Sequence, residues 1–313
     1  MYYFIVNTHS RSGKGWGIWD ELKSILEENK VSYKTFITEY PAHARVLARE
    51  VQEMLGADDI IVVMGGDGSL NEVIDGLDLA KKTTIGFIPT GSGNDFARGL
   101  QLSEDPRGAL INILKSNEVK TIDIGKATFT SSTDDKEVVR KFCVSSGFGY
   151  DAAVCYDINK SVVKKIFNAI HLGKLSFFVI GVKQWLAHPK TGGTISVDGE
   201  KEKRFRKLDF LSCHNLPYEG GGYPFAPGAN PSDGLLSICV VAIPSRLKYF
   251  AALILSKNIV GIHTRFKGTK IINCANANIK LDKPLHVHTD GEVHGKFDKI
   301  SYSIQKDAID VIM

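Results

Sequence analysis

The 313-residue sequence lacks a hydrophobic run long enough to cross a bilayer, and it lacks a recognisable leader. Its longest clean apolar stretch near the middle, Leu175–Val182, is far shorter than the roughly 20 residues of a spanning helix. Met1–Asn7 is short, apolar and strand-like, without the basic start or cleavage site of a signal peptide. We therefore expect a cytoplasmic protein that would associate with the inner face of the membrane as a peripheral protein.

Paired cysteines and a strong charge excess are also missing. The five cysteines form no CxxC pair and mostly lie in apolar runs, which favours buried reduced thiols. The net charge of +4 and pI of about 8.6 suit a protein that meets phosphates or an anionic membrane. The excess is too small to indicate nucleic-acid binding, which we do not expect.

The length and the 43% of hydrophobic residues favour two domains with a sizeable core. Over residues 1–120, strand and helix patterns alternate, as in the buried runs Ile60–Met64 and Ile85–Pro89. This alternation predicts an α/β domain of three layers around a parallel sheet.

After residue 120 the pattern changes to short strands separated by Gly, Pro, Asp and Asn. Residues 121–304 are therefore predicted to form an antiparallel β-sandwich, interrupted by helices near Ser161–Ala187 and Ser245–Gly261. We expect that residues 305–313 could pack back on the first domain.

The strongest local motif is the segment Gly65-Gly66-Asp67-Gly68-Ser69-Leu70-Asn71-Glu72, between a buried strand and an amphipathic helix. Consecutive glycines let a backbone approach phosphate oxygens, and the following helix begins with free N–H groups. Asp67 could meet a metal that accompanies the phosphates. The alternative is a tight turn with an incidental acid, at a prior of about one in three for so short a motif.

Two more loops follow strands. Thr90-Gly91-Ser92-Gly93-Asn94-Asp95 comes after Ile85–Pro89, so it falls at the carboxyl end of a parallel strand, where ligands bind in α/β sheets. The segment from Asn7 to Gly15 is rich in Ser, Gly and Lys but lacks the Walker A spacing. Together the loops predict a site for a magnesium nucleotide.

These segments resemble the signature loops of the diacylglycerol kinase catalytic domain, which occurs in bacterial lipid kinases and sphingosine kinases. Asn215–Gly222 and Phe225–Leu236 look like the second-domain signature of that family, and Asp290-Gly291-Glu292 looks like its late acidic motif. The resemblance covers nearly the whole chain. It departs at Asn7–Gly13, where the family usually has Asn-Pro-x-Ser-Gly.

The resemblance implies an ATP- and Mg²⁺-dependent kinase that acts on a lipid hydroxyl at the membrane surface, with diacylglycerol as the expected acceptor; it leaves a homodimer open. It makes Glu292 the general base, and it puts Asp67, Asp95 and Asp123 in a magnesium-linked network. A second, structural magnesium would bind Asp233 and carbonyls near Asn230 and Leu235. The implied nucleotide contacts are Asn7, Ser10, Ser12, Gly13, Thr38, Gly65, Gly66, Asp67, Gly68, Ser69, Asn71, Glu72, Ser92 and Asn94.

Two other features compete with these assignments. Asp198-Gly199-Glu200 repeats the late acidic tripeptide, but it precedes a charge run and is predicted to be a plain hairpin turn. His286 and His288 could be read as a zinc pair, although alternate positions on a strand favour an ordinary strand face. The sequence also leaves open a soluble-substrate kinase of the NAD kinase type and a nucleotide-binding protein without catalysis.

Overall fold

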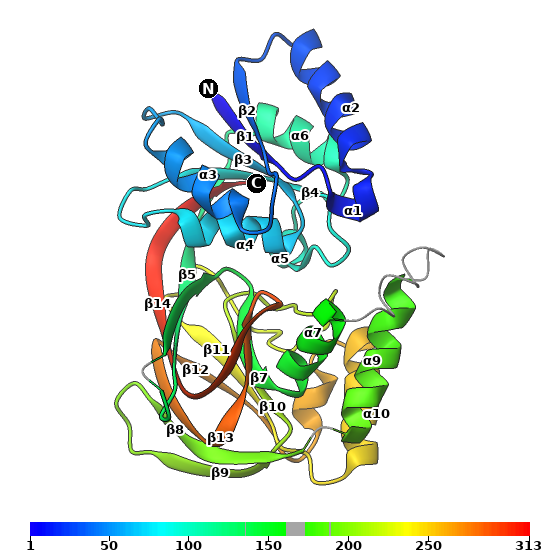
Figure 1. Cartoon of the computed structure of the whole chain (residues 1–313), viewed down its shortest axis with the longest axis vertical. Helices are drawn as coiled ribbons and strands as arrows, with labels where there is room; N and C mark the ends of the chain where they lie inside the picture. Colours follow the sequence, from blue (N-terminus) through cyan, green and yellow to red (C-terminus); the bar gives the residue numbers. More distant parts are fainter. Residues whose placement is uncertain (135, 161–172, 188) are drawn as a thin grey trace.

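The computed structural model describes residues 1–134, 136–160, 173–187 and 189–313 (Figure 1). An α/β domain that contains the N-terminus lies at one end of the long axis and a β-sandwich at the other. The predicted fold class, α/β followed by an antiparallel sandwich, is confirmed. None of the described helices is long and apolar enough to cross a membrane.

The α/β domain has a parallel sheet in the order β4-β3-β1-β2. Alternate residues of one strand pack on opposite faces: Ile5 packs with α3 and α4, and Phe4 packs with α2 and α6. The elements are β1 (Tyr2–Val6), α1 (Ser10–Gly13), α2 (Gly15–Glu28), β2 (Tyr33–Ile37), α3 (His43–Gln52), β3 (Ile60–Gly65), α4 (Asp67–Gly76), β4 (Thr84–Pro89), α5 (Asp95–Leu100) and α6 (Pro106–Lys115).

The sandwich domain is antiparallel, and apolar side chains from all ten of its strands, β5 to β14, form its main core. Its strands are β5 (Val119–Thr130), β6 (Glu137–Phe142), β7 (Ser145–Gly149), β8 (Thr191–Val197), β9 (Lys203–Leu208), β10 (Phe210–His214), β11 (Leu236–Val241), β12 (Thr269–Cys274), β13 (Asn276–Thr289) and β14 (Glu292–Ile312). Its helices are α7 (Tyr150–Lys160), α9 (Gly173–Ala187), α10 (Arg246–Asn258) and the 3₁₀ turn η1 (Ile262–Arg265). Part of the helix predicted near Ser161–Ala187, residues 161–172, lies outside the described residues.

One strand ties the two domains together. β14 pairs with β13 and β5 in the sandwich, and its last residues pair in parallel with β4, with Asp310 opposite Thr84. A break in register between Gln305 and Ile309, with Asp307 at φ 50°, turns the strand from one domain into the other. In Figure 1 this red strand runs beside the green β5 from the sandwich to the upper sheet.

Candidate active site

The loops after β1, β3 and β4 interlock at one edge of the sheet. Asn7 Nδ2 donates to Ser69 Oγ at 2.9 Å, and Thr90 Oγ1 donates to Ser10 Oγ at 2.9 Å. A Cβ atom on Gly91 would lie 2.7 Å from the Cα of Gly66. Glycine is therefore required here because the two loops touch, a constraint that holds with or without a phosphate ligand.

Asp67 joins the second loop to the third. It is the first residue of α4, and its carboxylate accepts the N–H groups of Asp95 and Phe96 at 3.0 and 3.1 Å. Burial, followed by the charge of Asp95, raises the pKa of Asp67 to about 6. A positive charge beside this carboxylate would therefore be strongly favoured.

Asp95 connects the loop after β4 to the sandwich. Its two oxygens accept the N–H groups of Gly221 and Gly222, each at 2.7 Å, and the Arg98 guanidinium at 2.8 Å. Burial is the main reason that the pKa of Asp95 is raised. A Cβ atom on Gly93 would lie 3.1 Å from Asp67 Oδ2 and 3.6 Å from Asp95 Oδ2, so both acids border the same point.

The other predicted nucleotide contacts fall into two groups. Gly68 and Ser92 face solvent beside the acids, and Gly13 has a φ of 91° with open space around its Cα. The other three side chains form hydrogen bonds within the protein. Thr38 Oγ1 donates to the Val6 carbonyl. The Ala42 N–H donates to the Glu72 carboxylate, and the Gly91 N–H donates to Asn94 Oδ1. The segment predicted as a loop forms the one-turn helix α1, and the Ser12 side chain lies outside the described residues.

A two-residue turn joins β13 to β14 and carries the late acidic motif. Asp290 and Gly291 have φ values of 45° and 84°, as such a turn requires. The Asp290 carboxylate accepts three consecutive backbone N–H groups, those of Cys143, Val144 and Ser145, at 2.8–3.0 Å.

Asp290 also binds the α/β domain directly. Asn71 Nδ2 of α4 donates to Asp290 Oδ2 at 2.8 Å and to the Lys141 carbonyl at 3.0 Å. Asn71 was predicted to contact the nucleotide, whereas the structure places its amide on the hairpin. The linking role of Asp290 was missed because its partners lie 145 or more residues away in the sequence.

Glu292 follows this turn and is exposed. It is close enough to α4 that its charge, after the larger effect of burial, helps to raise the pKa of Glu72. Glu200 lies on the β8–β9 hairpin, where it is exposed and pairs with Lys203 at 2.7 Å. Of the two acidic tripeptides, only the later one contacts helix α4.

Asp123 belongs to a different group from Asp67 and Asp95. Its two oxygens accept the N–H groups of Gly234 and Asp307 at 2.7 and 2.8 Å. It thereby supports the loop that contains Asn230, Asp233 and Leu235, all of which are exposed. Asp233 Oδ1 accepts the Leu235 N–H at 2.9 Å. Asp123 thus has different hydrogen-bond partners from those of Asp67 and Asp95.

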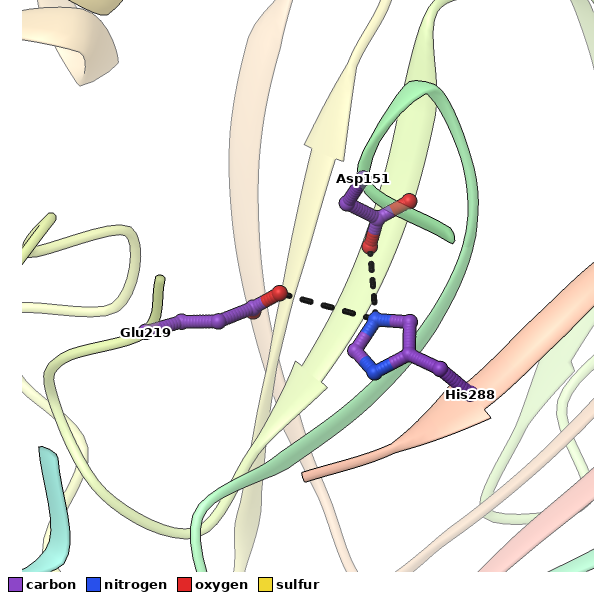
Figure 2. A group of neighbouring side chains, drawn as sticks. All are labelled: Asp151, Glu219 and His288. Carbon is purple, nitrogen blue, oxygen red and sulfur yellow. Dashed lines mark hydrogen bonds and ion pairs between the residues drawn. The ribbon is translucent and has the colours of Figure 1, made fainter. Parts of the chain in front are cut away.

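A buried cluster that sequence reasoning did not predict lies behind the hairpin (Figure 2). His288 Nε2 lies 3.2 Å from Asp151 Oδ2 and 3.5 Å from Glu219 Oε1. Burial raises the pKa of Glu219 to about 8. The expectation of an ordinary strand face was therefore wrong for His288, which is fully buried against two acids.

The contacts of His288 decide what this cluster can hold. The Gly291 nitrogen lies 3.3 Å from His288 Nδ1, and Nε2 faces the acids. Burial lowers the pKa of His288, but the hydrogen bond and the charge of Asp151 raise it overall to about 8, so Nε2 carries a hydrogen that it donates to the acids. A metal ion would need the lone pair of Nε2. Although the three ligand atoms lie within 4.8 Å of one another, the arrangement is that of a hydrogen-bonded cluster that braces the Asp290–Gly291 turn.

A cavity of about 280 Å³ opens beside the cluster. It is lined by Ala153 and Tyr156 of α7, Gln184 of α9, and Leu285 and His286 of β13. The Tyr156 and His286 rings stack with centroids 3.9 Å apart. Because α7 begins next to Asp151 and β13 continues to His288 and the hairpin, the cavity lies on the sandwich side of the site.

The glycine-rich loops and helix α4 of the α/β domain thus contact two turns of the β-sandwich. The chain belongs to the diacylglycerol kinase-like family: residues 1–127 match the diacylglycerol kinase catalytic domain, and residues 144–313 match the YegS C-terminal NAD kinase beta sandwich-like domain. The predicted membership is confirmed.

Two relatives agree with this assignment, and a solved structure shares the fold. "Putative lipid kinase YtlR" of Bacillus subtilis (strain 168) is 28% identical over 297 residues, which cover 94% of each chain. A diacylglycerol kinase of Staphylococcus aureus (strain Newman) is 26% identical over 276 residues, 87% of this chain and 80% of its own. The crystal structure of a diacylglycerol kinase from Bacillus anthracis str. Sterne has a TM-score of 0.69 at 19% identity, and the match covers 99% of this chain and 96% of that one.

Proposed function

We propose that this protein transfers the γ-phosphoryl group of Mg-ATP to the hydroxyl of a lipid, with diacylglycerol as the acceptor and phosphatidic acid as the product. The observation that carries the proposal is the contact of the Asp290–Glu292 hairpin with α4. It sets a free carboxylate of the sandwich domain beside the loops of the nucleotide-side domain.

The nucleotide side is assigned to the interlocked loops. Gly68 and Ser92 offer exposed backbone beside Asp67, and the helix α4 begins there, which favours a phosphate. Asp67 and Asp95 would face Mg²⁺, which supplies charge neutralisation for the transferring phosphoryl group. The raised pKa of Asp67 fits this role, because a neighbouring cation would stabilise its ionised form.

The acceptor side is assigned to Glu292 and the neighbouring cavity. The cavity is lined by apolar residues and by the polar residues Tyr156, Asp157, Gln184, His286 and Lys296. This mixture suits a lipid with a polar hydroxyl end. Glu292 would accept the hydroxyl proton as the oxygen attacks phosphorus. Asp290 holds the turn rigidly through its four N–H contacts, so that the carboxylate two residues later is positioned before the acceptor binds.

Three further assignments complete the proposal. The loop from Asn230 to Leu235, supported from behind by Asp123, would bind a second magnesium ion that stabilises the sandwich domain. The functional domains would meet near residue 120, with the end of β14 returning to the first. The protein would act at the cytoplasmic face of the membrane.

A panel of acceptors tests this function against its alternatives. The protein is incubated with γ-labelled ATP and detergent-dispersed diacylglycerol, phosphatidylglycerol or sphingosine, with NAD, or with no acceptor. We expect labelled phosphatidic acid, and no label with Asp67→Ala. Label on NAD would establish the soluble-substrate kinase, and ATP binding without transfer to any acceptor would favour the non-catalytic alternative.

A further inference from the structure

Helix α10 displays large apolar side chains to solvent along one face. Its inner face buries Tyr249, Ala252 and Ser256. Its outer face and the residues that follow expose Leu247 (74%), Ile254 (43%), Leu255 (38%), Ile259 (50%) and Val260 (64%). Five of the 15 exposed large hydrophobic side chains in the described residues therefore lie within residues 247–260. Such crowding is typical of an interaction surface.

Helix α9 extends this surface. Trp185 Nε1 donates to the Arg246 carbonyl at 3.0 Å, and the Trp185 and Phe250 rings lie 4.6 Å apart. These contacts hold α9 against α10, as the adjacent helices at the edge of Figure 1 show. The surface, here called the α9–α10 ridge, consists of Val179, Leu186, Leu247, Ile254, Leu255, Ile259 and Val260, all of which are exposed.

Positive charge surrounds the ridge. Residues 235–281 contain seven Lys and Arg and no Asp or Glu, although the whole chain has a net charge of only +4. Five of these cations lie in or just after α10 and are exposed, namely Arg246, Lys248, Lys257, Arg265 and Lys267. An apolar face flanked by cations, with no acid nearby in the sequence, complements an anionic lipid surface.

We propose that the α9–α10 ridge docks on a bilayer that contains anionic lipids, with its apolar side chains among the acyl chains and its cations on the headgroups. The inference rests on the proposed lipid acceptor and adds where the protein meets it. Gln184, which lines the cavity, is adjacent to Trp185, which packs on α10. Helix α9 therefore contributes to both the cavity and the ridge, so docking would hold the cavity near the bilayer.

Vesicle co-sedimentation tests the docking. The vesicles are made of phosphatidylcholine with phosphatidylglycerol, or of phosphatidylcholine alone. We expect Leu247→Glu/Ile254→Glu and Lys248→Glu/Lys257→Glu each to weaken binding to the mixed vesicles by at least about tenfold, since one interfacial cation contributes about fivefold. The matched controls Val46→Glu/Met54→Glu, around helix α3, and Lys23→Glu/Lys34→Glu should bind like the wild type.

Activity on detergent-dispersed diacylglycerol separates this inference from the proposed function. The ridge variants should phosphorylate the dispersed lipid at the wild-type rate while losing activity on vesicles. Wild-type-like vesicle binding by the ridge variants would overturn the docking, as would binding that does not depend on phosphatidylglycerol. A wild-type dimer that the apolar variants convert to monomers, without vesicle binding, would make the ridge a protein interface. Ridge-dependent vesicle binding without phosphorylation of any lipid would refute the proposed function alone.

Discussion

The two Asp-Gly-Glu turns of this chain have the same sequence and nearly the same backbone. The Asp and Gly φ values are 47° and 77° in the first turn and 45° and 84° in the second. In both turns the Asp carboxylate accepts backbone N–H groups from a neighbouring segment: Ala275 and Asn276 for Asp198, and Cys143 to Ser145 for Asp290. In both turns, the Asp side chain therefore attaches the end of the hairpin to the neighbouring segment by hydrogen bonds.

The difference lies in what each tip touches. The Asp198 turn fastens to the β12–β13 connection of its own domain, and Glu200 pairs with Lys203 at the surface. The Asp290 turn fastens to the β6–β7 connection and also to Asn71 of α4, so it bridges the two domains. Under the proposed function, Glu292 can act as the base and Glu200 cannot, because only the hairpin of Glu292 contacts the α/β domain.

The largest expected difference between the turns is in stability. Asp290→Ala removes the acceptor of four N–H donors, most of them buried, and should cost at least about 3 kcal/mol in unfolding free energy. Asp198→Ala affects two N–H groups near the surface and should cost about 1 kcal/mol. Denaturant unfolding of both variants measures this. Equal losses would mean that the two turns are equivalent.

A smaller effect is expected at Asp67, on the helix that only the second turn reaches. Its pKa is about 6 in the folded protein against 3.8 for an ordinary Asp, so the folded state binds the proton more tightly. The resulting stability is full below about pH 4 and is lost as the pH rises through 6. Relative to Asp67→Asn, the wild type should lose about 1–3 kcal/mol between pH 4 and pH 7. Parallel stability curves for the two proteins would show that Asp67 titrates normally.

The smallest effect is expected at the loop from Asn230 to Leu235, which the hydrogen bonds of Asp198 and Asp290 do not reach. Asp233→Ala removes one hydrogen bond at an exposed position, so its cost without magnesium should be below about 1 kcal/mol. Added Mg²⁺ should raise the melting temperature of the wild type more than that of the variant, with ATP affinity unchanged. If Mg²⁺ stabilises both proteins equally, the proposed second site does not exist.

Much of the fold could be predicted from local patterns. The fully apolar run of β3 and the glycine-rich segments after β3 and β4 indicated a parallel sheet with loops at its carboxyl edge, and the structure brings those loops together. The sequence did not predict that residues on both sides of position 305 belong to one strand, β14, because Gln305-Lys306-Asp307 interrupts the apolar alternation. In the structure these residues form an irregularity that the strand passes through.

The site was predicted only in part because its links are tertiary. No local pattern indicates that Asp290 will bind Asn71, 219 residues away, or that Asp151 will meet His288, 137 residues away. Asp123 was grouped with Asp67 and Asp95 through a family resemblance, yet its hydrogen bonds depend on how the loop at Gly234 folds over β5. Residue type identified candidate acids, and three-dimensional packing determined the hydrogen-bond partners of each.

The most direct test of the account is the turnover of Glu292→Gln and Glu200→Gln at saturating lipid. Glutamine keeps the size of the side chain and removes its proton-accepting charge. We expect Glu292→Gln to lower the rate about 10²- to 10⁴-fold without a change in ATP affinity, and Glu200→Gln to leave the rate nearly unchanged. Loss of activity in Glu200→Gln with full activity in Glu292→Gln would contradict the assignment of the base. Full activity in both variants would show that neither hairpin supplies it.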